Sequence, residues 1–187
     1  MNEQTPLPIP EAATAVLRCA AHTAWMLLRR EIHLPRENVG KTVRFADGSS
    51  ARVFRETVVE GAPEHPCALV VEFRLRLIHG PRGHALFRRE SLLNTPLFVG
   101  FPGFVSKLWI AHDEHGVYRG VYEWDRPERA EHYARSLWRV LQVGCDPRSI
   151  HYMVLPGIRR DSLITGLGEL DALPDAAQAW WRPIEAA

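Results

Sequence analysis

Two titratable side chains in the second half of the chain are of the types needed to move a proton or stabilise a negative charge. His151 has an intrinsic pKa near physiological pH and lies in a stretch expected to be a strand, which could aim it into the same cavity as Lys107. Lys107 could stabilise a developing enolate or phenolate. We therefore take His151 as a candidate proton acceptor and Lys107 as a candidate anion-stabilising group. A hydrogen-bonded structural histidine is the open alternative for His151.

Aromatic residues alternate along two neighbouring stretches, 104–111 and 117–124, and 113–116 between them has the polar, glycine-bearing composition of a hairpin turn. If the hairpin closes there, one face carries Lys107, Trp109, Tyr118, Tyr122 and Trp124, and the other carries Leu108, Ile110, Arg119, Val121 and Glu123. A one-residue change of register would scramble both sets. The aromatic face could bind a flat, hydrophobic ligand, or it could simply fill a core or a subunit interface.

Arg74 and Arg76 lie on the polar side of a predicted strand, beside Glu72. In a water-poor cavity both guanidinium groups would need anionic partners, which Glu72 or a substrate carboxylate could supply. We take the two arginines as candidate substrate-binding residues. The alternative is a solvated sheet edge or ion pairs between subunits.

The elements that must position these residues follow one another as strand, helix, hairpin, helix and strand over 68–155. Apolar residues alternate through 68–78, and helical spacing follows from 86 to 93. After the hairpin, Asp125 is expected to cap a second helix that ends near Gly144, and 149–155 is the last strand. This βαββαβ order predicts an α+β fold with an antiparallel sheet, helices on one face, and an uncovered face that needs a partner.

Further segments flank this core within what we expect to be a single domain, 1–187. An amphipathic helix is predicted at 10–32 and a hairpin extension at 42–59. The tail, 158–187, is predicted to be a loop with a short helix near 176–181. Trp180 and Trp181 would be costly to leave in water, so the tail is expected to fold back or to meet another subunit.

The hairpin and second helix resemble those of mono-oxygenases of the YdhR type, in the dimeric α/β-barrel superfamily. The resemblance lies in 104–109 (FVSKLW), Gly116, 118–125 (YRGVYEWD) and 130–134 (AEHYA). It implies a ferredoxin-like βαββαβ core whose sheets pack face to face as a homodimer, with a pocket in each subunit. Members of the superfamily include cofactor-free oxygenases, haem-degrading enzymes, isomerases and proteins without demonstrated activity. The fold alone therefore does not predict the reaction.

These observations lead to a first hypothesis, a small cofactor-independent mono-oxygenase or isomerase acting on an aromatic or polyketide-like molecule in a dimer-associated cavity. The alternative is a non-catalytic ligand-binding or scaffold protein of the same fold. A third hypothesis, contact of the N-terminal helix with a membrane surface, is the weakest of the three.

Composition and motifs exclude several other classes. A hydrophobic fraction of 46% and a charged fraction of 24% are typical of a soluble globular protein. A net charge of +1 gives no strong positive potential that would attract nucleic acid. Three widely separated cysteines indicate a reducing compartment, hence the cytoplasm. No metal-ligand spacing, dinucleotide-binding glycine motif or serine hydrolase elbow occurs, so we predict no metal and no cofactor. Flavin and haem stay open, because apolar contacts alone could hold them.

Overall fold

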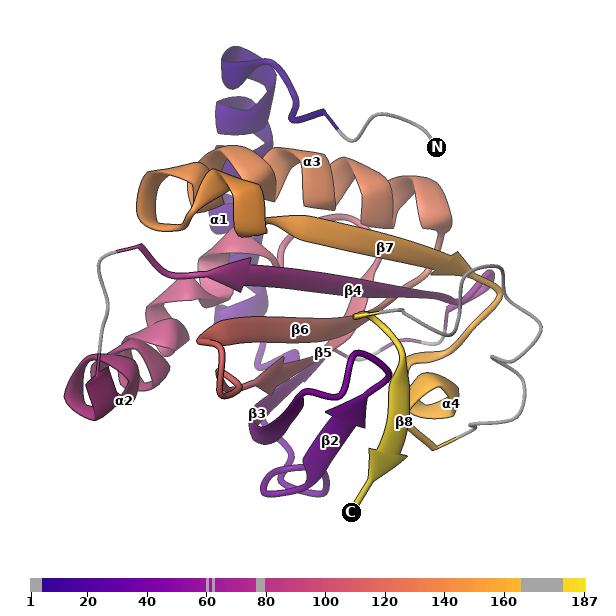
Figure 1. Cartoon of the computed structure of the whole chain (residues 1–187). Coiled ribbons are helices and arrows are strands. Elements are labelled where there is room, and N and C mark those ends of the chain that lie inside the picture. Colours follow the sequence, from indigo (N-terminus) through magenta and orange to yellow (C-terminus); the bar gives the residue numbers. More distant parts are fainter. Residues whose placement is uncertain (1–4, 60, 62, 77–79, 166–179) are drawn as a thin grey trace.

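A curled antiparallel sheet forms the centre of the fold, and helices pack against it (Figure 1). The computed structural model describes residues 5–59, 61, 63–76, 80–165 and 180–187. The strands are β1 Ile32–His33, β2 Thr42–Phe45, β3 Ser50–Val59, β4 Cys67–Arg74, β5 Phe104–Ile110, β6 Val117–Trp124, β7 His151–Pro156 and β8 Pro183–Ala186. The helices are α1 Ile9–Leu28, α2 Gly80–Glu90, α3 Pro127–Gly144 and α4 Arg160–Thr165, with 3-10 turns η1 Ser91–Leu97 and η2 Pro147–Ser149.

The strand order is β7-β4-β6-β5-β3-β2-β8, with the short β1 paired to β3. Each of these pairings is antiparallel. The prediction of an α+β fold is therefore confirmed. Strand β3 joins two parts of the sheet, because it pairs with β5 on one side and with β2 on the other.

Local sequence explains where the two long helices begin and end. Proline occupies the first turn of both α1 and α3, where its missing N–H has no helical partner to lose. Helix α1 ends at Leu28 rather than at residue 32, because Arg30 takes a left-handed φ of 58°. The predicted cap of α3 is wrong by one residue: Arg126 holds the N-cap position without a side-chain bond, and Asp125 instead pairs with Arg129.

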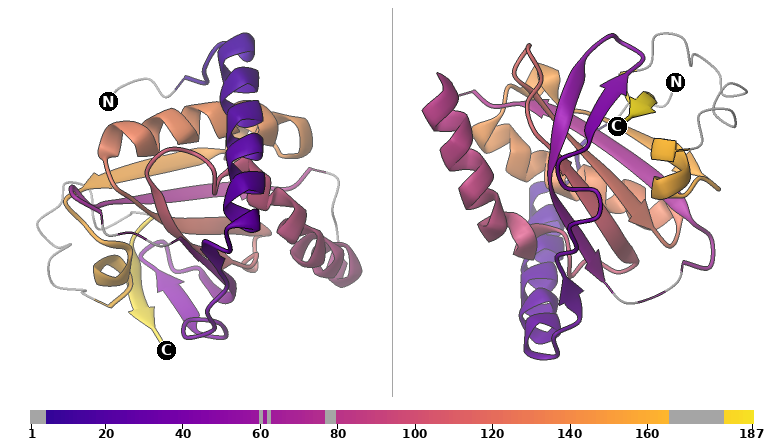
Figure 2. Two further views of the ribbon diagram at one scale, coloured as in Figure 1. Left: turned by 180° about the vertical axis from the view of Figure 1, so that it is seen from behind. Right: turned by 90° about the horizontal axis from the view of Figure 1, so that it is seen from below.

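Helices α1 and α3 and the turn η1 cover one face of the sheet (Figure 2). Side chains from these elements and from β4, β5 and β6 form one hydrophobic cluster, which includes Trp109, Tyr122, Trp124 and Tyr133. Aromatic rings dominate this layer, so close packing there depends on bulky, shaped side chains rather than on aliphatic ones alone. The candidate aromatic face of the hairpin is thus the face under the helices.

The opposite face of the sheet is not bare, and the expectation that it lies uncovered is wrong. Leu108, Val121 and Val70 on this face pack in a second cluster with Phe45 of β2 and Leu163 of α4. Trp181 is buried in the same cluster, so the C-terminal segment folds back onto its own chain. Because β2, β8 and α4 cover this face, its apolar side chains do not need a second subunit to be buried.

Two further predictions change at the edges of the elements. The strand expected over 68–78 ends at Arg74, and Leu75 adds only an isolated bridge to Cys145. In the tail, α4 and β8 form where a loop was expected. Most of the helix predicted at 176–181 lies outside the described residues.

Candidate functional site

The register of the β5–β6 hairpin decides which side chains share a face. Lys107 is opposite Tyr122, and Trp109 is opposite Gly120. Because neighbouring residues alternate sides, Lys107, Trp109, Tyr118, Tyr122 and Trp124 lie on the helix-covered face. The predicted grouping of these five residues is confirmed, and so is the opposite set that contains Arg119 and Glu123.

An apolar cavity of about 220 Å³ lies between this face and the helices. Its floor is formed by Lys107, Trp109 and Tyr122 of the hairpin, and its walls come from β4, η1 and α3. The residues that line it are Phe73, Leu75, Phe87, Asn94, Leu97, Phe98, Lys107, Trp109, Tyr122, Tyr133, Leu137, Val140, Leu141, Gly144 and Cys145. A cavity of roughly 150 Å³ can hold benzene, so this one has room for a substituted single ring.

The amine of Lys107 points into an aromatic surrounding. Its Nζ lies 3.2 Å from the centroid of the Trp109 ring, 4.5 Å from that of Phe98 and 4.6 Å from that of Tyr122. The residue is only 6% exposed, and among the described residues no carboxylate forms an ion pair with it. Burial lowers the pKa of Lys107 well below that of a free lysine, and the positive charge of Arg55 adds to this effect.

Two effects on this amine oppose each other. Cation–π contacts with three rings favour the protonated form, by about 2 kcal/mol for each desolvated contact. Removing an ammonium group from water costs several kcal/mol even after relaxation of the protein. The net effect is a lowered pKa, so the neutral amine forms at a lower pH than in a free lysine, and the surrounding rings can accept the cation when it forms.

A pair of tyrosines supplies a hydrogen-bond donor to the same cavity. The Tyr133 hydroxyl donates to the Tyr122 hydroxyl over 3.1 Å, and both residues line the cavity. Burial raises the pKa of both phenols, so both stay protonated at neutral pH. Because Tyr133 donates within the pair, the Tyr122 proton is left for an acceptor in the cavity.

Gly120 makes room for this arrangement. A Cβ atom at this position would lie 2.8 Å from Cε2 of Tyr122 and 3.2 Å from Cε of Lys107. Any side chain at position 120 would therefore push the Tyr122 ring away from the strand. Sequence reasoning did not identify Gly120, Tyr133 or Asn94 as site residues. The available signal in the sequence was that Gly120 lies two residues from Tyr118 and two residues from Tyr122 in β6. A glycine inside a strand often marks a place where another group packs closely against the backbone.

Arg55 of β3 lies next to Trp109, its cross-strand neighbour. Its guanidinium carbon is 3.8 Å from the centroid of the Trp109 ring, and Nη2 donates to the Ser91 carbonyl oxygen at 2.8 Å. The indole Nε1 of Trp109 in turn donates to the Thr57 hydroxyl. Trp109 is thus held in place by β3 on one side while its ring contacts the Lys107 amine.

Two of the predicted aromatic site residues have roles in packing. Trp124 is fully buried and packs on Phe104 and Tyr133. Tyr118 lies among Phe73, Phe87 and His84, and its hydroxyl lies 2.8 Å from Nδ1 of His84. Neither lines the cavity, so the core-packing interpretation describes these two side chains.

His151 does not share a cavity with Lys107, and that expectation is wrong. His151 is opposite Glu72 in the β4–β7 pairing, and Glu72 is opposite Arg119, so His151 lies on the other face of the sheet. Its Nδ1 is 3.1 Å from Glu72 Oε1, and this hydrogen bond raises the pKa of His151 above its ordinary value. With its side chain half exposed, His151 has the geometry of a surface ion pair.

The two predicted substrate-binding arginines also lie outside the cavity. Arg74 is exposed at the end of β4. Arg76 donates from Nη2 to the carbonyl oxygen of Cys145, a residue of the cavity wall. Glu72 pairs with Arg119 and His151 instead of with either arginine.

Arg119 is the centre of a buried ionic cluster that the sequence did not indicate. It contacts Asp47 and Asp113 at 2.8 Å each and Glu72 at 3.3 Å, and it lies over the Phe45 ring. Asp113 also accepts backbone N–H groups of the hairpin turn. This cluster joins β2, β4 and the turn of the β5–β6 hairpin, which is a structural role.

The described residues indicate neither a metal site nor a reactive thiol. Over those residues no group of three or more metal-binding side chains occurs. Cys19, Cys67 and Cys145 are buried, and burial raises the pKa of each thiol, to about 11 for Cys19 and about 12 for the other two. Thiols with such pKa values are not nucleophilic at neutral pH.

Comparison with known proteins adds little to this geometry. No family model matches the chain, and no curated protein matches it in sequence. One similar solved structure is described as that of a major regulator of staphylococcal pathogenesis. It is 15% identical, with a TM-score of 0.41 over 59% of this chain and 69% of that one. Within the described residues, no helix has the length and apolar character needed to cross a membrane.

Proposed function

We propose that the protein is a cofactor-independent enzyme that moves a proton within a small aromatic carbonyl compound bound in the cavity under α3. The observation that carries this proposal is the buried Lys107 amine, whose pKa is lowered, in an apolar, ring-sized cavity that Tyr122 also lines. A general base of this kind contributes about 10²–10⁴-fold to a proton transfer. The cavity volume favours a single-ring substrate over a fused polyketide.

In the proposed reaction, the lone pair of Lys107 Nζ takes a proton from the carbon next to the substrate carbonyl. The electrons of that C–H bond form a C=C bond, and the carbonyl becomes an enolate. The Tyr122 hydroxyl donates a hydrogen bond to the enolate oxygen, and the new ammonium group faces the enolate in a medium of low dielectric. Return of the proton to the enolate oxygen gives the enol isomer, and its return to the carbon gives back the ketone; either step restores the neutral amine.

An oxygenase reaction would begin with the same step, because the enolate carbanion is the species that reacts with O₂. The resemblance of the hairpin and second helix to YdhR-type mono-oxygenases supports this branch of the proposal. The order β7-β4-β6-β5, with helices after β4 and β6, supports a ferredoxin-like core. The proposal does not require a second subunit, because the described cavity is lined by one chain.

The second candidate is a non-catalytic protein that binds a small aromatic molecule in the same cavity. It is favoured by the composition of the lining, where Lys107 is the one amine and hydrocarbon side chains predominate among the described residues. Both candidates predict retention of a single-ring ligand. They differ in whether hydrogen atoms of the ligand's C–H bonds exchange with the solvent.

The test is deuterium incorporation into a panel of aryl ketones and arylpyruvates incubated with the protein in D₂O and followed by mass spectrometry. We expect exchange at the carbon next to the carbonyl, and its loss in Lys107→Met, which keeps much of the side-chain volume. Lys41→Met is the matched control, because these are the two lysines of the chain and Lys41 lies outside the cavity. His151→Ala should also retain exchange.

Equal exchange rates for the wild type and Lys107→Met would remove the catalytic role. Binding of a ring compound without any exchange, abolished by a bulky substitution in the cavity, would establish the second candidate instead.

A further inference from the structure

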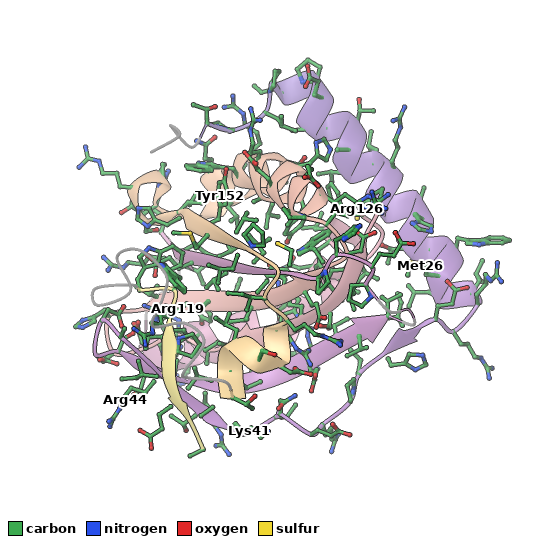
Figure 3. All side chains as sticks on the ribbon, turned by 90° about the vertical axis from the view of Figure 1, so that its right-hand side faces the viewer. Met26, Lys41, Arg44, Arg119, Arg126 and Tyr152 are labelled. Carbon is green, nitrogen blue, oxygen red and sulfur yellow. The ribbon has the colours of Figure 1, made fainter. Side chains whose placement is uncertain are left out.

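Helix α1 exposes an apolar face on the side that points away from the rest of the protein. Ala13, Leu17, Ala21, Ala24 and Leu28 recur at helical spacing, and we call them the outer stripe. Leu17 is 70% exposed and Leu28 is 80% exposed, and the three alanines are exposed as well. Figure 3 shows α1 at the edge of the molecule, with side chains projecting away from the sheet.

The other side of α1 is already packed. Cys19 and Met26 are buried against η1 and the main core, and Cys19 Sγ lies 3.1 Å from the Pro96 carbonyl oxygen. Gly100 sits so close that a Cβ there would lie 2.1 Å from the Cys19 carbonyl oxygen. Helix α1 therefore cannot turn its outer stripe inward, because its inner face is tightly held.

A helix that is apolar on both sides is normally covered on both sides. The charged residues of α1 lie beside the outer stripe and not within it: Glu11, Arg18 and Arg29 are on one flank by helical spacing. On the other flank, Ile9 and Leu27 are also exposed, at 68% and 55%. An uninterrupted apolar sector of this width is a docking surface rather than a scatter of surface hydrophobics.

The order of large and small residues on the outer stripe fits a second copy of the same helix. In an antiparallel pair with its two-fold axis between Ala20 and Ala21, Leu17 meets Ala24 of the other copy. Leu28 likewise meets Ala13. Each leucine thus faces an alanine, which lets the two helices approach closely and interdigitate.

The charged residues near the two ends of α1 also fit an antiparallel pair of helices. Glu11, near the start of α1, reaches the level of Arg29 and Arg30 at the end of the opposing helix. Among the described residues Glu11 forms no ion pair, whereas Arg29 pairs with Glu31 at 2.8 Å within its own chain, so Arg29 would be shared between Glu31 and the opposing Glu11. Two Glu–Arg pairs related by symmetry would then fix the antiparallel direction.

We propose that the outer stripe of α1 is a homodimer interface in which two copies pack antiparallel about the Ala20–Ala21 position. This surface is separate from the sheet face on which the family resemblance places a dimer, and it is independent of the function proposed for the cavity. A lipid surface is the competing occupant. The alanines favour a helix, because membrane binding grows with buried apolar area and alanine supplies little of it.

Helix α1 is about 30 Å long, so the pair is smaller than a standard interface of about 800 Å² per partner. We therefore expect a dissociation constant of about 1–100 μM, which sedimentation equilibrium can measure. Leu17→Glu should weaken association at least tenfold. Val143→Glu is the matched control, since Val143 is 81% exposed at the end of α3, away from the stripe, and its substitution should change nothing.

Charge reversal tests the direction of the pair. Glu11→Arg alone and the double variant Arg29→Glu, Arg30→Glu should each dimerise more weakly, because like charges then face each other. An equimolar mixture of the two should regain wild-type association as a heterodimer, since each variant supplies the charges that the other lacks. Ala21→Cys should form an intermolecular disulfide under oxidation, and Ala13→Cys should not, because its two copies lie about 20 Å or more apart.

Wild-type protein that stays monomeric up to about 1 mM would overturn the proposal, as would association that Leu17→Glu leaves unchanged. Failure of the mixed variants to associate would overturn the antiparallel arrangement. Monomeric protein that binds vesicles containing anionic lipid, with binding lost in Leu17→Glu, would assign the outer stripe to a membrane surface instead. Circular dichroism of each variant separates loss of association from loss of folding.

Discussion

The amine of Lys107 lies 3.2 Å from the centroid of the Trp109 ring, in a cavity where no described carboxylate pairs with it. Most buried lysines are balanced by an acid, so this one destabilises the fold without an evident structural role. A group that weakens the fold and lines a cavity is a good candidate for a functional group.

Replacing Lys107 should stabilise the protein. Lys107→Met removes a buried unpaired amine and keeps an apolar chain of similar length, so we expect the free energy of unfolding to rise by about 1–3 kcal/mol at pH 7. Urea denaturation of wild type and variant measures the difference. An unchanged or lower free energy of unfolding would show that the contacts of the amine with the surrounding rings fully offset its desolvation.

The difference in the free energy of unfolding between the wild type and Lys107→Met should depend on pH in a defined direction. The folded pKa of Lys107 is depressed, so between that pKa and about 10.4 the unfolded chain binds one more proton than the folded chain. Over that interval the stability of the wild type should rise relative to Lys107→Met, with a limiting slope of about 1.4 kcal/mol per pH unit. A difference that is flat with pH would contradict the depressed pKa.

The two tyrosines should contribute unequally to the proposed proton transfer. Tyr122→Phe removes the hydroxyl that would face the enolate oxygen and should lower the exchange rate by about 10²–10³-fold. Tyr133→Phe leaves that hydroxyl in place and removes only the hydrogen bond it accepts, so the loss should be clearly smaller. Equal losses would mean that the two phenols act as one unit, and a larger loss for Tyr133→Phe would reverse their roles.

Arg119 should be the residue of the ionic cluster whose loss is most costly. Arg119→Met leaves the buried Asp113 carboxylate without its cation and removes one of the two partners of Glu72, so we expect a loss of about 3–5 kcal/mol in the free energy of unfolding. Arg44→Met is the control, because Arg44 and its partner Glu185 are both exposed, so loss of this pair should cost much less. Chemical denaturation of both variants gives the comparison.

His151 should titrate as the partner of Glu72 and not as a catalytic base. Its pKa is raised mainly by the hydrogen bond to Glu72, so Glu72→Gln should lower that pKa toward 6.5, as followed by NMR of the imidazole ring. The stabilisation from this pair is fully present below pH 6.5 and is lost as the pH rises through the folded pKa. An unchanged His151 pKa in Glu72→Gln would contradict the pairing.

The faces of the β5–β6 hairpin could be predicted because strand periodicity and a glycine-bearing turn fix them locally. Gly116, in the turn, has a φ of 77°, which favours glycine. Lys107, Trp109 and Tyr122 were placed together for this reason. The face of His151 could not be predicted, because it depends on the register between β7 and β4, which are far apart in sequence.

The cover of the second sheet face could not be predicted either. It comes from β2, β8 and α4, segments whose short apolar runs gave no sign of where they would pack. Arg119 illustrates the same limit, since its partners Asp47, Glu72 and Asp113 come from three separate segments. Tertiary packing, rather than local pattern, decided both features.

The most direct test of the central claim is the titration of Lys107 itself. Protein labelled with ¹³C at lysine Cε should give two lysine resonances, because the chain contains Lys41 and Lys107 and no other lysine. The Lys107→Met variant assigns them. We predict that the pKa of Lys107 lies well below that of an ordinary lysine, because burial disfavours the charged amine. A Lys107 resonance that titrates at the ordinary lysine value of about 10.4 or above would contradict the lowered pKa, and with it the proposed proton transfer.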